Sequence, residues 1–286
     1  MSMLLICGHT TIPRNGLVDC MPENSAIVRI SGNNETRATG LLRRSKRRAL
    51  GGYPSQVVWW GVSPTYIQER FDCERPRYLA RLFGSVPLFP VYMVNDYAHR
   101  YAAKSDFWNY VHPQYDLRIT HVPTPGALVA VHRNNHSHSG EGLWIGRYED
   151  RPRTYATITR YIADRDEYRV HFARNGTNVS TLIGKKRRKL GSVYTEAQVQ
   201  IRNLENGWVY SYWGQQVEGN RAIRILAAVR HVVDQFDGDI CGAIDVVWDR
   251  EARRAYAIEY NSAPGINHSA VRNFYRTYFA SFEGES

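Results

Sequence analysis

Two short segments near the C-terminus place polar side chains inside apolar sequence. Asp245 lies in the run GAIDVV at 242–247, and Glu259 and Asn261 lie in AIEYNSAPG at 257–265. Residues two apart on a strand point to the same face, so Glu259 and Asn261 would lie together. Two carboxylates on neighbouring buried strands repel each other and are costly to desolvate unless a cation binds them. Asp245, Glu259 and Asn261 are therefore predicted ligands of Mg²⁺, which takes one or two carboxylates and leaves other positions to water and phosphate.

The order of these residues resembles the metal-binding signature of ATP-grasp enzymes. That signature has an Asp, about a dozen residues, a Glu-x-Asn and then Pro-Gly, here Pro264-Gly265. The family includes ribosomal-protein glutamate ligases, glutathione synthetases and D-alanine–D-alanine ligases. Two other segments, VVWWG at 57–61 and EYRVH at 167–171, are similar to ATP-grasp proteins of bacteriophages. The resemblance covers roughly residues 55 to 266.

The resemblance implies a fold and a division of the chain. We expect an α/β (α+β) protein with the ATP-grasp fold, in which two α+β subdomains clamp ATP behind an N-terminal α/β pre-grasp domain. The pre-grasp domain would occupy residues 1–92, the small lid subdomain 93–163 and the large C-terminal subdomain 164–286. The expected cofactors are ATP and Mg²⁺, with Mn²⁺ as an alternative ion.

The resemblance also implies how the nucleotide is held. In this family the lid donates a cation from a strand and covers the phosphates with a glycine-rich loop, where backbone N–H groups approach anionic oxygens closely. A second cation comes from the segment before the lid, and the adenine lies against a hinge strand. His132 competes with Arg133 for the lid cation. The expected nucleotide-binding residues are Arg75, Arg77, Arg133, Ser139, Gly140, Gly142, Arg160, Tyr161, Ile162 and Asn203.

Four basic residues are expected to act in the transfer step. In the glutamate-ligase relatives an arginine on the equivalent strand holds the acyl-acceptor side or the forming acyl phosphate, which implies this role for Arg169. Lys185 or Lys186, after a return strand at 179–183, would neutralise phosphate charge. An Arg/Asn pair in the relatives contacts phosphate and metal, which implies a catalytic Arg202.

Hydrophobic periodicity predicts the elements that position these residues. Residues 167–172 alternate strictly, so Glu167, Arg169 and His171 share one face. For His171 we expect this to be the exposed face of a half-buried strand. Asn175-Gly176 predicts a hairpin turn. Other strands are predicted at 4–7, 57–61, 128–132, 154–162, 241–248 and 255–260, and helices at 74–83, 95–111, 222–233 and 271–282.

Composition limits the protein class. Lys and Arg number 37 against 27 Asp and Glu, a formal charge of +10, which attracts polyanions. Contact with a polyanion through Arg43 to Arg48 and Lys185 to Lys189 is one hypothesis. No apolar run is long enough to span a bilayer, no signal peptide is recognised, and four scattered cysteines favour reduced thiols. We therefore expect a cytoplasmic protein with no membrane partner.

These observations favour an ATP-dependent carboxylate–amine ligase that forms an amide through an acyl phosphate. The acyl donor and the amine would be an amino acid, a peptide or a protein. Two alternatives remain open at this stage: an ATP-grasp kinase that phosphorylates a hydroxyl, and a basic nucleic-acid-binding protein.

Overall fold

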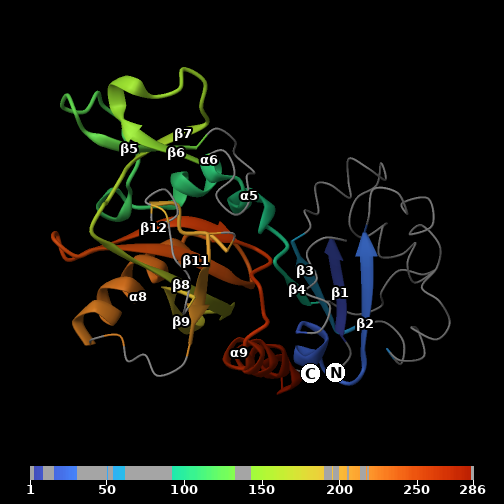
Figure 1. The fold of residues 1–286 in the computed structure, drawn as a ribbon. Helices are drawn as coiled ribbons and strands as arrows, with labels where there is room; N and C mark the ends of the chain where they lie inside the picture. The colour runs from blue at the N-terminus through green and yellow to red at the C-terminus, as the bar shows by residue number, and fades with distance from the viewer. Residues whose placement is uncertain are drawn as a thin grey trace.

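A computed structural model describes most of the chain. The described residues are 3–8, 16–30, 50, 54–61, 92–132, 143–189, 195, 200–204, 206–212, 217 and 219–284. Their strands form three sheets, which lie apart from one another in Figure 1. The predicted mixed α/β class is confirmed. The predicted helix at 74–83 and the basic run from Arg43 to Arg48 lie outside the described residues. Of the helices that are described, none has the length and apolar character needed to cross a membrane.

The N-terminal sheet is parallel, in the order β2-β1-β3-β4. Met3–Cys7 of β1 and Val57–Trp60 of β3 are apolar and fully buried, as expected for a parallel sheet covered on both faces, and Gln56 at the start of β3 is buried as well. The strands predicted at 4–7 and 57–61 are therefore confirmed. The strands are β1 (Met3–Gly8), β2 (Ser25–Ile30), β3 (Gln56–Trp60) and β4 (Tyr92–Val94).

A small antiparallel sheet, in the order β6-β5-β7, stands above the rest of the molecule in Figure 1. The 3-10 turn Tyr148–Asp150 follows β6. The last strand is shorter than the predicted 154–162. The strands are β5 (Leu128–His132), β6 (Leu143–Arg147) and β7 (Thr157–Arg160).

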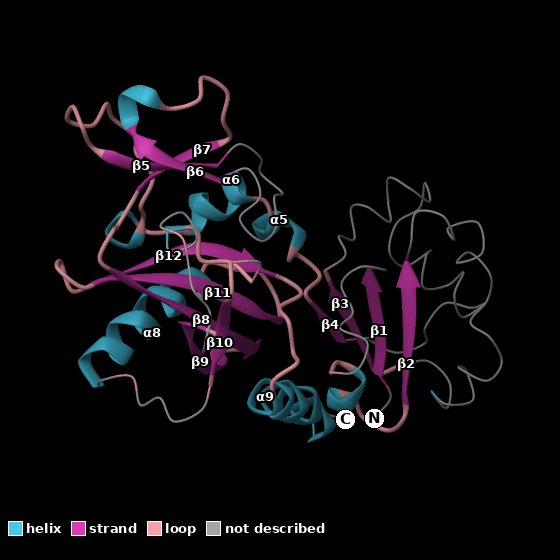
Figure 2. Ribbon diagram, in the orientation of Figure 1, coloured by secondary structure: helices cyan, strands magenta, loops and turns pink. Residues whose placement is uncertain are grey.

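The central sheet is antiparallel, in the order β10-β9-β8-β11-β12. Helix α8 (Gly219–Val233) packs on one face of it, and the small sheet lies beyond the other face (Figure 2). Gly176 forms the predicted hairpin turn between β8 and β9, with a φ of 56° that glycine adopts readily. The strands are β8 (Arg165–Asn175), β9 (Asn178–Arg188), β10 (Trp208–Ser211), β11 (Ile240–Asp249) and β12 (Arg254–Asn261).

Alternation along β8 decides which side chains enter the core. Tyr168, Val170 and Phe172 pack with the apolar face of α8, including Ile225 and Val229. Glu167, Arg169 and His171 consequently point to the opposite face, as the period-two pattern predicts. That opposite face is where the polar side chains of the central sheet gather.

Strand β9 is longer than its apolar sequence suggests. The predicted return strand ends at residue 183, but the ladder continues through Arg188 because β10 supplies partners for the basic residues. Lys185 pairs with Ser211 and Lys186 with Tyr210. The lysine-rich run is therefore part of a strand, so its successive side chains point to opposite faces.

The segment predicted as one helix at 95–111 is broken. It forms α5 (His99–Ala102), α6 (Lys104–Phe107) and the 3-10 turn Trp108–Tyr110, with Ala103 extended between the helices at φ −75° and ψ 139°. The break lets Tyr101 and Tyr110 pack around Phe236, so tertiary packing overrides helix propensity here. Shorter 3-10 turns occur at Val18–Cys20 and Pro113–Tyr115.

The final helix joins the two larger sheets. Helix α9 (Ser269–Ala280), which continues into the 3-10 turn Ser281–Gly284, agrees with the predicted helix at 271–282. Tyr275 on α9 contacts Trp60 of β3 edge to face at 5.2 Å. Strand β4 crosses the predicted domain boundary at residue 92, and the exact division of the chain stays a prediction.

Asn95 ties the N-terminal sheet to the central sheet. Its Nδ2 donates to the Trp59 carbonyl (2.9 Å), and its Oδ1 accepts from the Cys241 N–H (2.7 Å). The side chain is fully buried, and its φ of 63° is a conformation that Asn tolerates better than most residues. Asn95 therefore satisfies backbone groups of β3 and β11 while turning the chain between them.

We predict that Asn95→Ala lowers the free energy of unfolding by about 3 kcal/mol, because two buried backbone groups lose their partners and Ala is strained at positive φ. Urea denaturation followed by circular dichroism measures this. Asn178→Ala, at an exposed position of β9, is the control and should change stability by less than about 0.5 kcal/mol. Equal stability of the two variants would exclude a linking role for Asn95.

Candidate active site

A cavity of about 640 Å³ lies between the small sheet and the central sheet. Its roof is formed by β5, β6 and β7, and its floor is the polar face of the central sheet. The volume falls within the roughly 300–1,000 Å³ of small-molecule and cofactor sites. The apolar side chains on its wall include Trp108, Leu117, Ala130, Leu143, Ile145, Ile162, Val247 and Ile258.

Positive charge exceeds negative charge among the described residues that line this cavity. Five cationic side chains and three carboxylates share the wall. The cations are Arg160, Arg165, Arg169, Lys186 and Arg202, and the carboxylates are Glu167, Asp245 and Glu259. A cavity with this excess of positive charge favours an anionic ligand.

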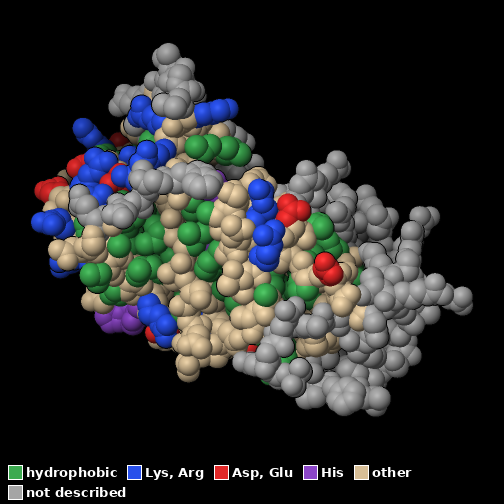
Figure 3. Space-filling model, turned by 90° about the horizontal axis from the view of Figure 1, so that it is seen from below, with side chains coloured by type: hydrophobic (Ala, Val, Ile, Leu, Met, Phe, Trp, Pro, Cys, Tyr) green, Lys and Arg blue, Asp and Glu red, His purple; other side chains and the backbone are tan. Residues whose placement is uncertain are grey.

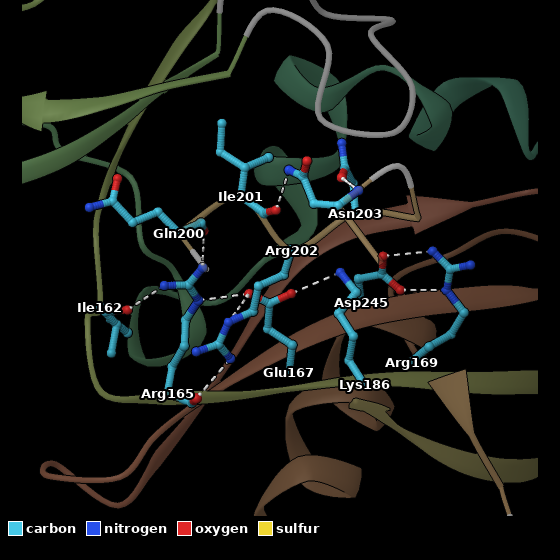
Figure 4. A network of polar contacts seen from close by, with 11 residues as sticks. Ile162, Arg165, Glu167, Arg169, Lys186, Gln200, Ile201, Arg202, Asn203 and Asp245 are labelled. Atoms are coloured by element: carbon cyan, nitrogen blue, oxygen red, sulfur yellow. Dashed lines mark hydrogen bonds and ion pairs between the residues drawn. The ribbon is translucent and has the colours of Figure 1, made fainter. Parts of the chain in front are cut away.

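Glu167 is the centre of one ion-pair network on the floor (Figure 4). Its Oε1 lies 2.7 Å from Arg165 Nε, and its Oε2 lies 2.8 Å from Lys186 Nζ. Burial alone would raise the pKa of the Glu167 carboxyl, but Lys186 and Arg165 hold it below its usual value. Burial likewise opposes the charge on Lys186, yet Tyr210 and Glu167 raise its pKa. Both groups therefore stay charged at neutral pH.

Arg169 and Asp245 form a second, bidentate pair beside the first. Arg169 Nε and Nη2 donate to the two carboxylate oxygens at 2.7 and 2.8 Å. Register explains the contact, since the two residues are direct partners across β8 and β11. Burial would raise the pKa of Asp245, but Arg169 lowers it. Tyr210 lies beneath the cations of Arg169 and Lys186, with its ring centre 4.5 and 5.2 Å away.

Arg202 and Asn203 reach the cavity from the segment before β10. Arg202 Nη1 donates to the Arg165 carbonyl (2.9 Å), and its guanidinium lies over the Trp208 ring. Burial and the charge of Arg165 lower the pKa of Arg202. Asn203 shapes the turn into β10, because its Oδ1 accepts the Asn206 N–H at 2.8 Å. Arg202 therefore adds a cation that a bound anion would stabilise.

The predicted metal ligands meet on the floor of the cavity. Asp245 and Glu259 are direct partners across β11 and β12, and Asn261 is two residues further along the same strand. A register shift leaves Ile258 as an extra residue, so Ile258 and Glu259 both line the cavity. Such bulges re-aim side chains beside active sites.

The donor set suits Mg²⁺ shared with phosphate. In the described part of the chain no three His, Cys, Asp or Glu side chains form a metal-binding group. Two carboxylates and an amide are nonetheless the protein share that Mg²⁺ needs when phosphate and water complete its shell. The Asp245 carboxylate, which also accepts a hydrogen bond from Tyr210, has more lone pairs than its bonds to Arg169 and Tyr210 use. Asn261 Oδ1 also accepts the Ala263 N–H (3.0 Å) and retains one lone pair.

The predicted hinge residues line the cavity at its apolar end. Arg160 N–H donates to the Leu117 carbonyl (2.8 Å), and Tyr161 N–H donates to the Leu128 carbonyl (3.1 Å). The Ile162 carbonyl accepts from Arg165 Nη1 (2.8 Å), which leaves it one lone pair. Arg160 Nη2 donates a hydrogen bond to the Tyr256 hydroxyl oxygen (2.7 Å). Several backbone groups of this segment therefore already have partners, which limits the hydrogen bonds that it can make to a nucleotide base.

Lys185 does not join the cavity. It points to the α8 face of the sheet, where its Nζ lies 3.0 Å from Asp166 Oδ1. Arg221 and Arg250 bind the same carboxylate. Viewed from below, Lys and Arg side chains gather with a few acidic ones at the end of the molecule away from the N-terminal sheet (Figure 3). Polyanion contact through Arg43 to Arg48 and Lys185 to Lys189 stays a prediction.

His171 is not exposed, contrary to the sequence-based expectation. Its side chain is fully buried, with Nε2 2.7 Å from the Tyr212 hydroxyl and Nδ1 3.0 Å from the Tyr275 hydroxyl. Tyr212, just after β10, and Tyr275 of α9 cover this end of the polar face. Burial and the charge of Arg169 lower the pKa of His171 well below its usual value, so the ring is neutral.

Several cavity residues were not predicted as site residues. Arg165, Tyr210 and Tyr212 line the wall, and the period-two alternation of β8 and β10 is the signal that places them there. The sequence pattern places Glu167 on the correct face of β8, but no functional role was predicted for it. The predicted residues Arg75, Arg77, Arg133, Ser139, Gly140 and Gly142 lie outside the described residues.

Neither a protein-family model nor a curated protein sequence matches this chain. Solved structures match it in fold. Carboxyaminoimidazole ribonucleotide synthase of Aspergillus clavatus, complexed with ATP, is 10% identical with a TM-score of 0.57 over 92% of this chain and 70% of that one. D-alanyl-alanine synthetase A of Vibrio cholerae is 14% identical with a TM-score of 0.55 over 100% and 94%.

A third structure, the VanG D-Ala:D-Ser ligase of Enterococcus faecalis, is 9% identical with a TM-score of 0.55 over 94% and 92% of the two chains. Such low identities show the fold alone. The matched region covers more than nine-tenths of this chain in each case. The chain therefore has the ATP-grasp fold.

Proposed function

We propose that this protein is an ATP-dependent carboxylate–amine ligase. The observation that supports it most is the convergence of buried cations and the Asp245–Glu259–Asn261 set on one cavity between two sheets. Two of the similar structures carry names that denote ligation of alanyl or D-alanine residues. We propose that the carboxylate and the amine belong to amino acids, peptides or proteins, and that the protein acts in the cytoplasm.

The cavity offers different environments at its two ends. The apolar wall beside the hinge, with Ile145 and Ile162, would accept the adenine. The floor would accept the phosphates, where Lys186 and Arg202 lie beside Glu167. Asp245, Glu259 and Asn261 would hold Mg²⁺, which would supply positive charge against the phosphates. In this arrangement the charged end of the nucleotide meets the charged end of the cavity.

The reaction would proceed in two transfers. A carboxylate oxygen of the first substrate takes the γ-phosphoryl group, the bond to the β-phosphate breaks, and ADP forms. The amine nitrogen then attacks the acyl carbon, the carbon–oxygen bond to phosphate breaks, and the departing phosphate takes up the proton that the nitrogen loses. Lys186 and Arg169 stabilise the negative charge that develops on the transferring group. The rest of the rate acceleration comes from positioning of the reacting groups by the rigid sheet.

We predict that Glu259→Gln lowers the rate of ADP release about a hundredfold or more, because the metal loses a charged ligand that contributes several kcal/mol to phosphoryl transfer. The assay screens amino acids and short peptides as carboxylates, with hydroxylamine to trap the acyl phosphate as a hydroxamate. Glu251→Gln, in the exposed β11–β12 turn, is the matched control and should behave as the wild type. Full ADP release by Glu259→Gln would refute the metal assignment, and a phosphorylated hydroxyl in place of the hydroxamate would indicate a kinase.

A second prediction compares two adjacent lysines on β9. Lys186→Gln should lower the rate of ADP release about a hundredfold, the usual effect of removing one fixed donor from a developing charge. Lys185→Gln should leave the rate unchanged, since Lys185 faces α8 and Asp166 keeps Arg221 and Arg250. The same assay measures both variants. Equal losses in the two variants would contradict the assignment of Lys186 to the floor of the cavity.

A further inference from the structure

A chain of hydrogen bonds runs from the cavity wall into the buried core. Tyr212, which lines the cavity, contacts His171 Nε2 at 2.7 Å. His171 Nδ1 contacts the Tyr275 hydroxyl at 3.0 Å, and that hydroxyl contacts the Gly242 carbonyl at 2.8 Å. The chain joins the residue after β10 to β8, α9 and β11. Which atom donates in each of these hydrogen bonds can be derived from the last one, to the Gly242 carbonyl.

The Gly242 carbonyl fixes the position of every proton in this chain. Two oxygens 2.8 Å apart need a hydrogen between them, and only the Tyr275 hydroxyl can supply it. Tyr275 then accepts from His171, so Nδ1 carries the proton. In a neutral ring Nε2 has only a lone pair, and Tyr212 must therefore donate its hydrogen to it. The contacts place the proton on Nδ1, and the ring is neutral because burial and the charge of Arg169 hold the pKa of His171 well below its usual value.

This direction has a consequence for the cavity. The single hydroxyl hydrogen of Tyr212 points at His171, so its oxygen offers only lone pairs to a ligand. The nearby floor of the cavity presents donors instead, on Arg169 and Lys186. The ring of Tyr212 is fixed as well, because it lies over Gly184, where a Cβ would come within 2.4 Å of it, and against His268. Tyr212 is thus a rigid acceptor at one end of a wall rich in donors.

We propose that the Tyr212 end of the cavity binds the amino group of the acyl acceptor, an inference that rests on the proposed ligase function. An N–H of a neutral amine donates to the Tyr212 oxygen and leaves the nitrogen lone pair directed at the acyl carbon. A carboxylate or phosphate oxygen would meet lone pairs there and is repelled. The charge of Arg169 close by disfavours an ammonium and so favours the nucleophilic amine. His171 and Tyr275 are positioning residues that hold the acceptor in one orientation.

The first test reads the proton positions without any ligand. In protein labelled with ¹⁵N-histidine, the imidazole resonances of His171 are assigned by comparison with His171→Gln. We expect a protonated Nδ1 and an unprotonated Nε2 at neutral pH. A proton on Nε2, in either a neutral ring or an imidazolium, would overturn the proposal, because Tyr212 would then be free to donate into the cavity.

The second test measures amine binding directly. Hydroxylamine, a neutral amine at neutral pH, is titrated into the full chain without ATP while the His171 resonances are followed. Tyr212→Phe should weaken its binding about tenfold, the usual effect of one lost hydrogen bond. Tyr278→Phe is the matched control, since its buried hydroxyl donates to the Arg174 carbonyl away from the cavity. In that variant the Tyr212 acceptor is intact, and binding should equal that of the wild type. Unchanged binding in Tyr212→Phe would overturn the proposal.

A rescue experiment separates orientation from simple packing. Because neither variant retains a His171 resonance, hydroxylamine binding is measured here by isothermal titration calorimetry, with the wild type measured in the same way. His171→Gln keeps an amide oxygen that can accept from Tyr212, and it should bind hydroxylamine nearly as well as the wild type. His171→Leu lets the Tyr212 hydrogen turn toward the cavity, and binding should fall about tenfold. Equal binding in the two variants would contradict the positioning role. These binding measurements need no turnover, so absence of ADP release with every carboxylate would refute the ligase function separately.

Discussion

A carboxylate buried in a β-sheet is stable in its charged form only where cations surround it, and the central sheet is organised around this requirement. Asp245 is held by a bidentate Arg169, and Glu167 by Arg165 and Lys186. Removing one partner of such a pair typically costs about 3–5 kcal/mol, because it leaves an uncompensated buried charge. The register of β8 against β11 and the length of β9 therefore cannot shift without loss of these pairs.

The same pairs prepare the cavity for its ligand. Cations already fixed by Glu167 and Asp245 need little reorganisation when an anion arrives, which is the condition under which electrostatic stabilisation is strongest. The carboxylates do not cancel the charge of the wall, since five cations face three carboxylates among the described lining residues. The structure thus keeps a charged site stable within the protein and leaves an excess for phosphate. Adjacent lysines of β9 point to opposite faces of the sheet. Lys186 faces the cavity, and Lys185 binds Asp166 on the face that α8 covers.

Polar groups at the other end of the floor are ordered by different means. His171, Tyr212 and Tyr275 are uncharged. Their donor and acceptor roles are set by the Gly242 carbonyl, which can only accept a hydrogen bond. A neutral chain of this kind costs less to bury than an ion pair, provided that every member is satisfied. The cavity therefore combines a charged region with a neutral, acceptor-bearing region. This difference matches two substrates of different charge, a nucleotide and an amine.

The sequence by itself determined the local patterns: the alternation of β8, the hairpin at Gly176, the strands around Asp245 and Glu259, and the class of fold. Periodicity and turn chemistry are properties of neighbouring residues, so no tertiary information is needed. Only the tertiary structure decided which face of each strand meets the cavity, because that depends on where α8 packs. It also extended β9 through Lys186, since β10 supplies the ladder partners. His171 was expected at the surface, and residues 41 and 104 positions away bury it. Such contacts are decided by chain topology, which no local pattern encodes.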